Sequence, residues 1–126
     1  MRPATVFLAG SLLALVFGLS FLAAPGAVLP LYGISPEAPT VLLARFFGVA
    51  LLHAGLAVYL LRDTRDSVVQ RALGLAGVVG SAAGAIVGLM GVLAGTVNAL
   101  GWSTVAIYAL LLLGYATCLR PRSALS

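Results

Sequence analysis

The stretch "GLAGVVGSAAGAIVGLMGVLAG", residues 74–95, decides the fold class, because it has the length of a membrane span and carries no charge. About 20 mostly apolar residues are needed to cross the roughly 30 Å hydrocarbon core of a bilayer. The stretch nevertheless contains seven glycines, the residue that a helix tolerates worst after proline. The spacing of these glycines therefore needs an explanation in terms of helix packing.

The seven glycines lie on one side of the predicted helix. At about 100° per residue they fall within an arc of about 120°, and bulky side chains suited to lipid tails occupy the opposite arc. Small residues allow helices in a bilayer to approach closely, and such packing must offset a propensity cost of at most about 5 to 7 kcal/mol. We call these residues the glycine stripe: Gly74, Gly77, Gly80, Gly84, Gly88, Gly91 and Gly95. The opposite arc comprises Leu75, Val79, Ile86, Met90, Leu93 and Val97.

Other predicted spans carry small residues that could meet the glycine stripe. The first span has Gly10, Ala14 and Gly18 at four-residue spacing, and the second has Gly48 and Gly55. This pattern predicts that the helix with the glycine stripe is the spine of a bundle, covered on its glycine side by neighbouring helices. The alternative is that the stripe forms a groove for a flat cofactor or a lipid chain.

The composition of the whole chain places it in a bilayer. Its 126 residues are 62% hydrophobic and 8% charged, with a mean hydropathy of +1.16, so too few polar side chains exist to cover a water-soluble domain. The longest connection is too short for a separate domain. The sequence predicts an all-α fold with residues 1–126 as one domain, an antiparallel up-and-down bundle of four transmembrane helices. The four predicted spans are Ala4–Ala24, Thr40–Leu61, Leu73–Val97 and Trp102–Leu119.

The arginines predict the orientation of these spans. All seven basic residues are arginine and the net charge is +4, but their positions favour a role in membrane topology over nucleic-acid binding. Six lie in segments that share one face of the membrane: Arg2, Arg62, Arg65, Arg71, Arg120 and Arg122. The positive-inside rule then places both termini in the cytoplasm. An alternative for the N-terminus is a secretory signal peptide, because Arg2, the apolar run 6–19 and the small residues of "FLAAPGA" fit that pattern.

Two further patterns predict helix starts and membrane boundaries. Ser35 is expected to cap the second span, and Ser67 with Gln70 has the spacing of a capping box at the start of the third. Four aromatic residues are expected in the interfacial belts, where amphipathic rings settle. They are Tyr32 and Trp102 at the outer face and Tyr59 and Tyr115 at the inner face.

Three polar side chains share one layer of the predicted bundle. Ser11, His53 and Ser81 all lie about 4 to 6 Å to the cytoplasmic side of the centre of their spans. One interpretation is that a neutral imidazole is hydrogen-bonded to a hydroxyl on a neighbouring helix. The other is that His53 binds a cofactor as the axial ligand of a tetrapyrrole, for which a second histidine would have to come from another subunit.

Arg45 lies within the second span, where its side chain can extend toward the outer face. It is either a structural brace or a site for an anionic group. The three carboxylates lie outside the spans, the single cysteine is Cys118, and the sequence contains no metal-ligand cluster or nucleophile beside a base. We therefore expect no enzymatic activity. The lack of an acidic residue within a span also argues against proton-coupled transport.

Three short motifs resemble a known family. They are "LYGI" (31–34), "ARFFGVALL" (44–52) and "NALGW" (98–102), and they are similar to motifs in a widespread family of small uncharacterised four-helix proteins of the bacterial inner membrane. The resemblance implies a multi-pass protein of the bacterial cytoplasmic membrane and no particular activity. It also implies a cluster of Tyr32, Arg45, Asn98 and Trp102 near the outer face.

These observations lead to three functional hypotheses. The first is a structural or accessory subunit that packs against itself or other membrane subunits of a larger inner-membrane complex, such as an energy-converting one. The second is a cofactor- or lipid-binding membrane protein that uses His53 or the groove of the glycine stripe. The third is a small carrier or channel. The expected partners are the lipid bilayer and membrane proteins, not nucleic acid.

Overall fold

The computed structural model describes residues 2–120, and the regular secondary structure of this part of the chain is all α-helix. Three helices, α1, α3 and α4, are long and apolar enough to cross a membrane, and α5 is a shorter apolar helix of 17 residues. Arg122, one of the six arginines behind the predicted topology, lies outside the described residues. The helices are α1 (Pro3–Ala23), α2 (Pro25–Leu31), α3 (Ala38–Leu61), α4 (Ser67–Leu93) and α5 (Gly101–Thr117).

The helices begin at residues other than the predicted caps. Asp66 is the cap of α4, because its Oδ1 accepts hydrogen bonds from the N–H groups of Val68 (2.8 Å) and Val69 (3.2 Å). Ser67 is already the first helical residue, so the predicted capping box is wrong. Ser35 lies before the start of α3, which has no side-chain cap. At the start of α4, the carboxylate of Asp66 also complements the positive end of the helix dipole.

Gly95 ends α4 and does not belong to its packing surface. Its φ of 72° lies in the left-handed region, and a Cβ there would meet no atom within 4 Å. The N–H of Thr96 bonds to the carbonyl of Gly91 (3.0 Å), and that of Gly95 bonds to Val92 (3.1 Å). These two bonds form a Schellman motif, in which glycine takes a conformation costly to other residues. Gly33, with a φ of 75°, ends α2 in the same way.

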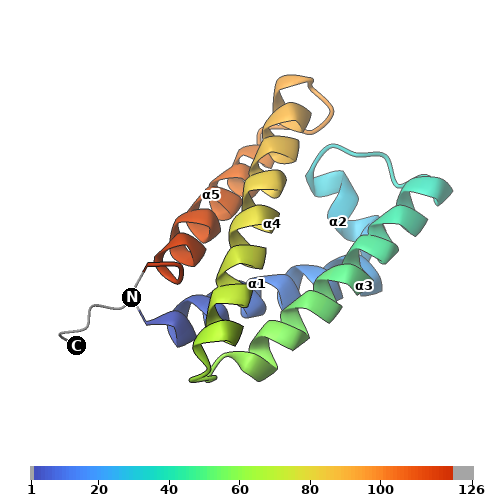
Figure 1. Ribbon diagram of the computed structural model, residues 1–126. Coiled ribbons are helices and arrows are strands. Elements are labelled where there is room, and N and C mark those ends of the chain that lie inside the picture. Colours follow the sequence, from blue (N-terminus) through green and yellow to red (C-terminus); the bar gives the residue numbers. More distant parts are fainter. Residues whose placement is uncertain (1, 121–126) are drawn as a thin grey trace.

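The four longer helices form two hairpins, α1 with α3 and α4 with α5 (Figure 1). Small residues create the first hairpin: a Cβ on Gly18 would lie 2.9 Å from the carbonyl oxygen of Gly48, and one on Gly55 would lie 3.0 Å from the Cβ of Ala14. The small residues of the first span therefore meet the second span and not the glycine stripe. The prediction that α4 is the spine of the bundle is wrong, because α4 makes no extended contact with α1 or α3.

The α5 helix covers much of the glycine stripe. A Cβ on Gly84 would lie 2.5 Å from Cε1 of Tyr108, and Gly77 faces the ring of Tyr115 in the same manner. A Cβ on Gly74 would contact the side chain of Cys118, and one on Gly88 would lie 3.2 Å from Cγ2 of Val105. Gly80 differs from these residues, because a Cβ there would meet nothing within 4 Å. The stripe therefore holds α5 side chains over most of its length and is open at Gly80.

The two hairpins meet at the end where α1 begins and α5 ends, which we call the inner end after the predicted topology. Phe7 is fully buried, and its ring centroid lies 6.2 Å from that of Tyr115. Gly10 gives room to the hydroxyl of Tyr115, whose ring also packs on Gly77. Tyr115 is only 7% exposed, so its predicted place in the aromatic belt is wrong. It instead joins α1 to both helices of the second hairpin.

Asn98 joins the hairpins at the opposite end, which we call the outer end after the predicted topology. Its Nδ2 donates to the carbonyl of Leu31 (2.9 Å), and its backbone N–H donates to that of Tyr32 (2.9 Å). Its Oδ1 accepts from the N–H of Leu100 (3.0 Å). Tyr32 makes a second link, through a 3.3 Å hydrogen bond between its hydroxyl and that of Thr104. The segment that carries Tyr32 follows α2, a short helix that folds back against α1 and α3 (Figure 1).

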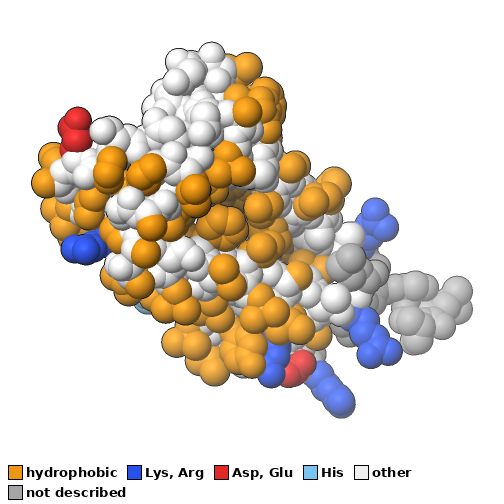
Figure 2. Space-filling view, turned by 180° about the vertical axis from the view of Figure 1, so that it is seen from behind, with side chains coloured by type: hydrophobic (Ala, Val, Ile, Leu, Met, Phe, Trp, Pro, Cys, Tyr) orange, Lys and Arg blue, Asp and Glu red, His pale blue; other side chains and the backbone are white. Residues whose placement is uncertain are grey.

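The surface of the molecule matches a bilayer environment. Charged side chains lie at the ends of the face shown in Figure 2, and hydrophobic side chains cover the region between them. Large apolar residues are exposed along all the long helices, including Ile86 (60%) and Met90 (64%) on the side of α4 that was predicted to face lipid. In water this much apolar exposure would be costly, whereas lipid tails accommodate it.

Candidate ligand-binding cavity

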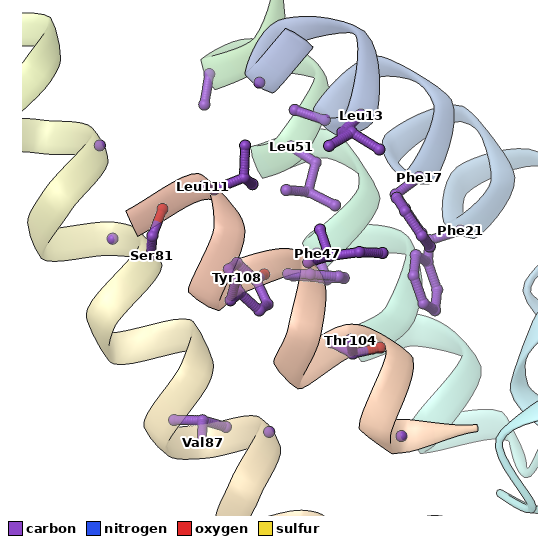
Figure 3. Close-up of a pocket in the computed structure, with 18 of the residues that line it drawn as sticks. Leu13, Phe17, Phe21, Phe47, Leu51, Ser81, Val87, Thr104, Tyr108 and Leu111 are labelled. Atoms are coloured by element: carbon purple, nitrogen blue, oxygen red, sulfur yellow. The ribbon is translucent and has the colours of Figure 1, made fainter. Parts of the chain in front are cut away.

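A cavity of about 590 Å³ lies between the two hairpins and is lined by residues of all five helices. It exists because the hairpins touch mainly at their ends, through Tyr115 and Asn98, while α4 stays apart from α1 and α3. Figure 3 shows aromatic rings from both hairpins around it, among them Phe21, Phe47 and Tyr108. The cavity therefore has an apolar wall that includes several aromatic rings.

Packed or hydrogen-bonded side chains line both ends of the cavity along the helix direction. Val58, Leu73 and Tyr115 line the inner end, and all three belong to the packed cluster around Phe7. At the outer end the lining includes Leu29 of α2, which is 5% exposed, and the hydrogen-bonded pair of Tyr32 and Thr104.

The cavity opens sideways, between α3 and α4. Lining residues on α1, α2 and α5 are buried or half-buried, and the exposed ones all belong to α3 and α4. This location agrees with the lack of extended contact between those two helices. We call the exposed lining residues the window: Phe47 and Ala54 on α3, and Ala76, Gly80 and Val87 on α4.

One hydroxyl in the cavity wall has no hydrogen-bond partner among the described residues. Ser81 is 5% exposed, and the described residues give its Oγ no hydrogen bond. Figure 3 shows its side chain projecting from α4, with the oxygen on the side of Leu111. No charged side chain lines the cavity in the described part of the chain. Every fully buried side-chain oxygen among the described residues has a partner, so the unbonded oxygen of Ser81 is accessible and can bond to a ligand in the cavity.

The predicted polar layer does not form. His53 is exposed on α3, and no hydrogen bond joins it to another described residue. Ser11 is 1% exposed and donates to the carbonyl of Leu8 in its own helix (2.9 Å). The reason is the direction of each side chain: Gly48 and Gly55 face α1, and His53 lies almost opposite them around α3. The polar layer was predicted from the depth of each residue in its span. Depth does not determine the direction of a side chain.

His53 does not line the cavity, so a tetrapyrrole there would find no imidazole ligand among the lining residues. The described residues also contain no group of three metal-ligating side chains. A role of His53 as an axial ligand would therefore lie on the lipid-facing surface of α3, with the second ligand supplied by another chain. The cavity itself offers hydroxyl groups and aromatic rings.

The predicted outer-face cluster forms only in part. Tyr32 and Asn98 come together through the bond that joins the hairpins. Trp102 is 49% exposed at the start of α5, and Arg45 is exposed on α3 with no ion pair in the described residues. Binding of an anionic group by Arg45 therefore stays a prediction, whereas Asn98 has a structural position.

A repeat distance in the sequence could have revealed the α4–α5 pairing. Tyr108 and Tyr115 are seven residues apart and thus lie on one face of α5, and Gly77 and Gly84 have the same separation on α4. In an antiparallel pair these distances match, and each ring fits one glycine. The sequence analysis considered only small residues as partners for glycine and so missed the tyrosines.

Comparisons of the chain with family profiles, curated proteins and solved structures gave no match. The similarity of the three short motifs to a bacterial membrane protein family therefore stays a prediction. A function has to be inferred from the cavity, its window and the residues that line them.

Proposed function

We propose that this is an integral membrane protein that binds an apolar molecule in the cavity between its hairpins. The observation that carries the proposal is the cavity itself, whose volume of about 590 Å³ falls within the roughly 300 to 1,000 Å³ of small-molecule sites. Its apolar wall and the unpartnered hydroxyl of Ser81 have the character of such sites, which combine an apolar lining with a few polar groups.

In the proposed arrangement four helices cross the bacterial inner membrane and both termini are cytoplasmic. α5 serves as the fourth span, because it packs along α4, although its 17 residues cover only about 25 Å at 1.5 Å per residue. A bilayer adapts to such a mismatch at modest cost. The positive-inside rule supports the orientation, with Arg62, Arg65 and Arg71 between α3 and α4 or at the start of α4.

The proposed activity is binding and not catalysis. The lining residues supply aromatic rings, aliphatic side chains and hydroxyls, and they include no carboxylate, imidazole or thiol. General acid–base or nucleophilic chemistry would need such groups beside the bound molecule. A channel is a weaker hypothesis, because Tyr115 and the Tyr32–Thr104 pair line the two ends of the cavity.

Photolabelling in vesicles tests this function. The protein is reconstituted with a trace of a photoactivatable octadecyl hydrocarbon, irradiated and digested, and the labelled residues are located by mass spectrometry. We expect label on Leu51 and Leu111 in the cavity wall. Excess unlabelled octadecane should remove this label, because it competes with the probe for a single, saturable cavity.

Val79 and Ile86 serve as internal controls for contact with bulk lipid. Both are more than half exposed and neither lines the cavity. Their labelling should not fall when octadecane is added, because the lipid-facing surface is not saturable. Labelling confined to such outward residues, with none at Leu51 or Leu111, would show that the cavity does not bind hydrocarbon and would contradict the proposal.

His53 supports a second candidate function, that of an accessory subunit in a larger membrane complex. The imidazole is exposed on the apolar surface of α3, where an unpaired polar group costs on the order of 1 to 3 kcal/mol. A neighbouring subunit that bonds to the ring would remove that cost. We expect the protein extracted in a mild detergent to migrate as a larger assembly, and His53→Leu to weaken it. A wild-type protein that stays a monomer in native membranes would exclude this function.

A further inference from the structure

The window opens at the level of the hydrocarbon core. Phe47 and Ala54 lie near the middle of α3, and Ala76 and Gly80 lie near the middle of α4. The middle of a membrane-spanning helix lies in the apolar part of the bilayer, and every residue of the window is itself apolar. A molecule that enters here arrives from the lipid and meets no charged side chain on the way.

The volume of the cavity limits the size of this molecule. An engineered protein cavity of about 150 Å³ holds one benzene, so about 590 Å³ offers room for roughly four such units, or about 24 non-hydrogen atoms. One long hydrocarbon chain with a small polar group has this size. A phospholipid with two acyl chains and a headgroup does not fit inside.

The polar chemistry of the wall limits the charge of this molecule. An ionised group would lose its hydration without finding a counter-charge, because no charged side chain lines the cavity in the described residues. Ser81, in contrast, offers a hydroxyl that is both donor and acceptor, is 5% exposed and lacks a partner in the described part. The wall thus favours one uncharged group that can form a hydrogen bond.

We infer that the cavity takes a single-chain neutral lipid from the bilayer through the window, and that the hydroxyl of Ser81 bonds to its polar group. This inference rests on the proposed function and adds to it the class of ligand, the contact that selects the ligand and the route of entry. The hydroxyl makes the cavity prefer a long-chain alcohol or carbonyl compound to the corresponding hydrocarbon, and the lack of counter-charge excludes the fatty acid anion.

Three probes with similar chains test the selection: oleyl alcohol, octadecene and oleate. Their binding to the purified protein is measured by native mass spectrometry, with release from detergent micelles. We expect oleyl alcohol to bind about three- to tenfold more tightly than octadecene, the range that one hydrogen bond supplies. Oleate at neutral pH should bind least.

Ser81→Ala removes the proposed contact and should abolish the preference for oleyl alcohol while octadecene still binds. Ser20→Ala is the matched control, because Ser20 is outside the cavity and bonds to the carbonyl of Val16 in its own helix (2.7 Å). That variant should keep the preference. Equal binding of the alcohol and the hydrocarbon to the wild-type protein would overturn the role of Ser81 and leave the proposed function intact. Failure of all three probes to bind would overturn the proposed function as well.

Gly80→Phe tests the route of entry. A Cβ at Gly80 meets nothing within 4 Å, so the larger side chain obstructs the window without a clash at its base. Ala83→Phe is the control, since Ala83 is an exposed residue of α4 outside the cavity lining. We expect uptake of oleyl alcohol from vesicles to slow severalfold in Gly80→Phe and to stay unchanged in Ala83→Phe. Equal uptake rates in the two variants would overturn entry between α3 and α4.

Discussion

Gly84 allows the ring of Tyr108 to lie directly against the backbone of α4. A side chain at this position has to displace the ring or separate α4 from α5. We therefore expect Gly84→Leu to lower the free energy of unfolding by about 1 to 3 kcal/mol, the usual cost of an overpacked contact. Thermal unfolding in detergent measures the effect.

Ile86 supplies the control for this change. It lies two residues away on the lipid-facing side of α4 and is 60% exposed, so Ile86→Leu exchanges one lipid-facing side chain for another. Its effect on the midpoint of thermal unfolding should be small. Equal midpoints for Gly84→Leu and Ile86→Leu would mean that the ring of Tyr108 does not pack on the glycine stripe.

Asn98 holds the outer ends of the two hairpins together with its side chain as well as its backbone. Asn98→Ala removes the bonds to Leu31 and Leu100. Because both bonds lie near water, we expect a loss of about 1 kcal/mol in stability, at the lower end for two hydrogen bonds. Ser103→Ala, which removes only a local bond to the carbonyl of Leu100, should cost less. Unfolding of both variants in detergent compares them, and equal losses would assign Asn98 a purely local role.

Along α4, the glycines serve different purposes, and replacement by alanine separates them. At Gly80 a methyl group has open space, so Gly80→Ala should stabilise the protein by up to about 1 kcal/mol through helix propensity. At Gly95 the φ of 72° strains any other residue, so Gly95→Ala should destabilise by about 1 to 2 kcal/mol. Thermal unfolding of the two variants should shift in opposite directions, and a shift in the same direction would contradict this assignment.

The sequence predicted the helices better than their contacts. Apolar runs located α1, α3 and α4 to within a few residues of the predicted spans at most ends, because a helix in lipid must satisfy its own backbone. The start of α4 was predicted to within one residue, because Ser67 was expected to be the cap and is instead the first helical residue after Asp66. α2 was not predicted, since a helix of seven residues with an internal proline has no clear periodic signal.

The partners of the small residues were beyond the reach of spacing alone. Gly10, Gly18 and the glycine stripe all indicate close approach, but each could accept a helix or an aromatic ring. The structure places backbone against Gly18 and tyrosine rings against Gly10 and Gly77. For the same reason the sequence identified Ser81 as a polar residue in the membrane without indicating that it faces a cavity. A cavity depends on where helices fail to meet, and no local pattern records that.

At the scale of the whole molecule, the proposed orientation can be measured directly. A reporter that is active only outside the cytoplasm should be silent when fused after Ser126, because we propose that both termini share the cytoplasmic face with the arginine-rich connection between α3 and α4. The same reporter inserted between Asn98 and Leu100 should be active. Activity at the C-terminal fusion would reverse the topology and with it the outer position of Asn98.

The division into two hairpins also bears on how the protein is made. The residues of α1 and α3 all precede residue 62, and those of α4 and α5 all follow residue 66. Each hairpin therefore becomes complete from one continuous piece of nascent chain, and the first can insert and close while the second is still being synthesised. The cavity comes into existence only when the second hairpin arrives, so lipid is already present at the surfaces that form its wall. If the cavity binds a lipid as proposed, its first occupant is therefore enclosed during biogenesis, before any later exchange through the window.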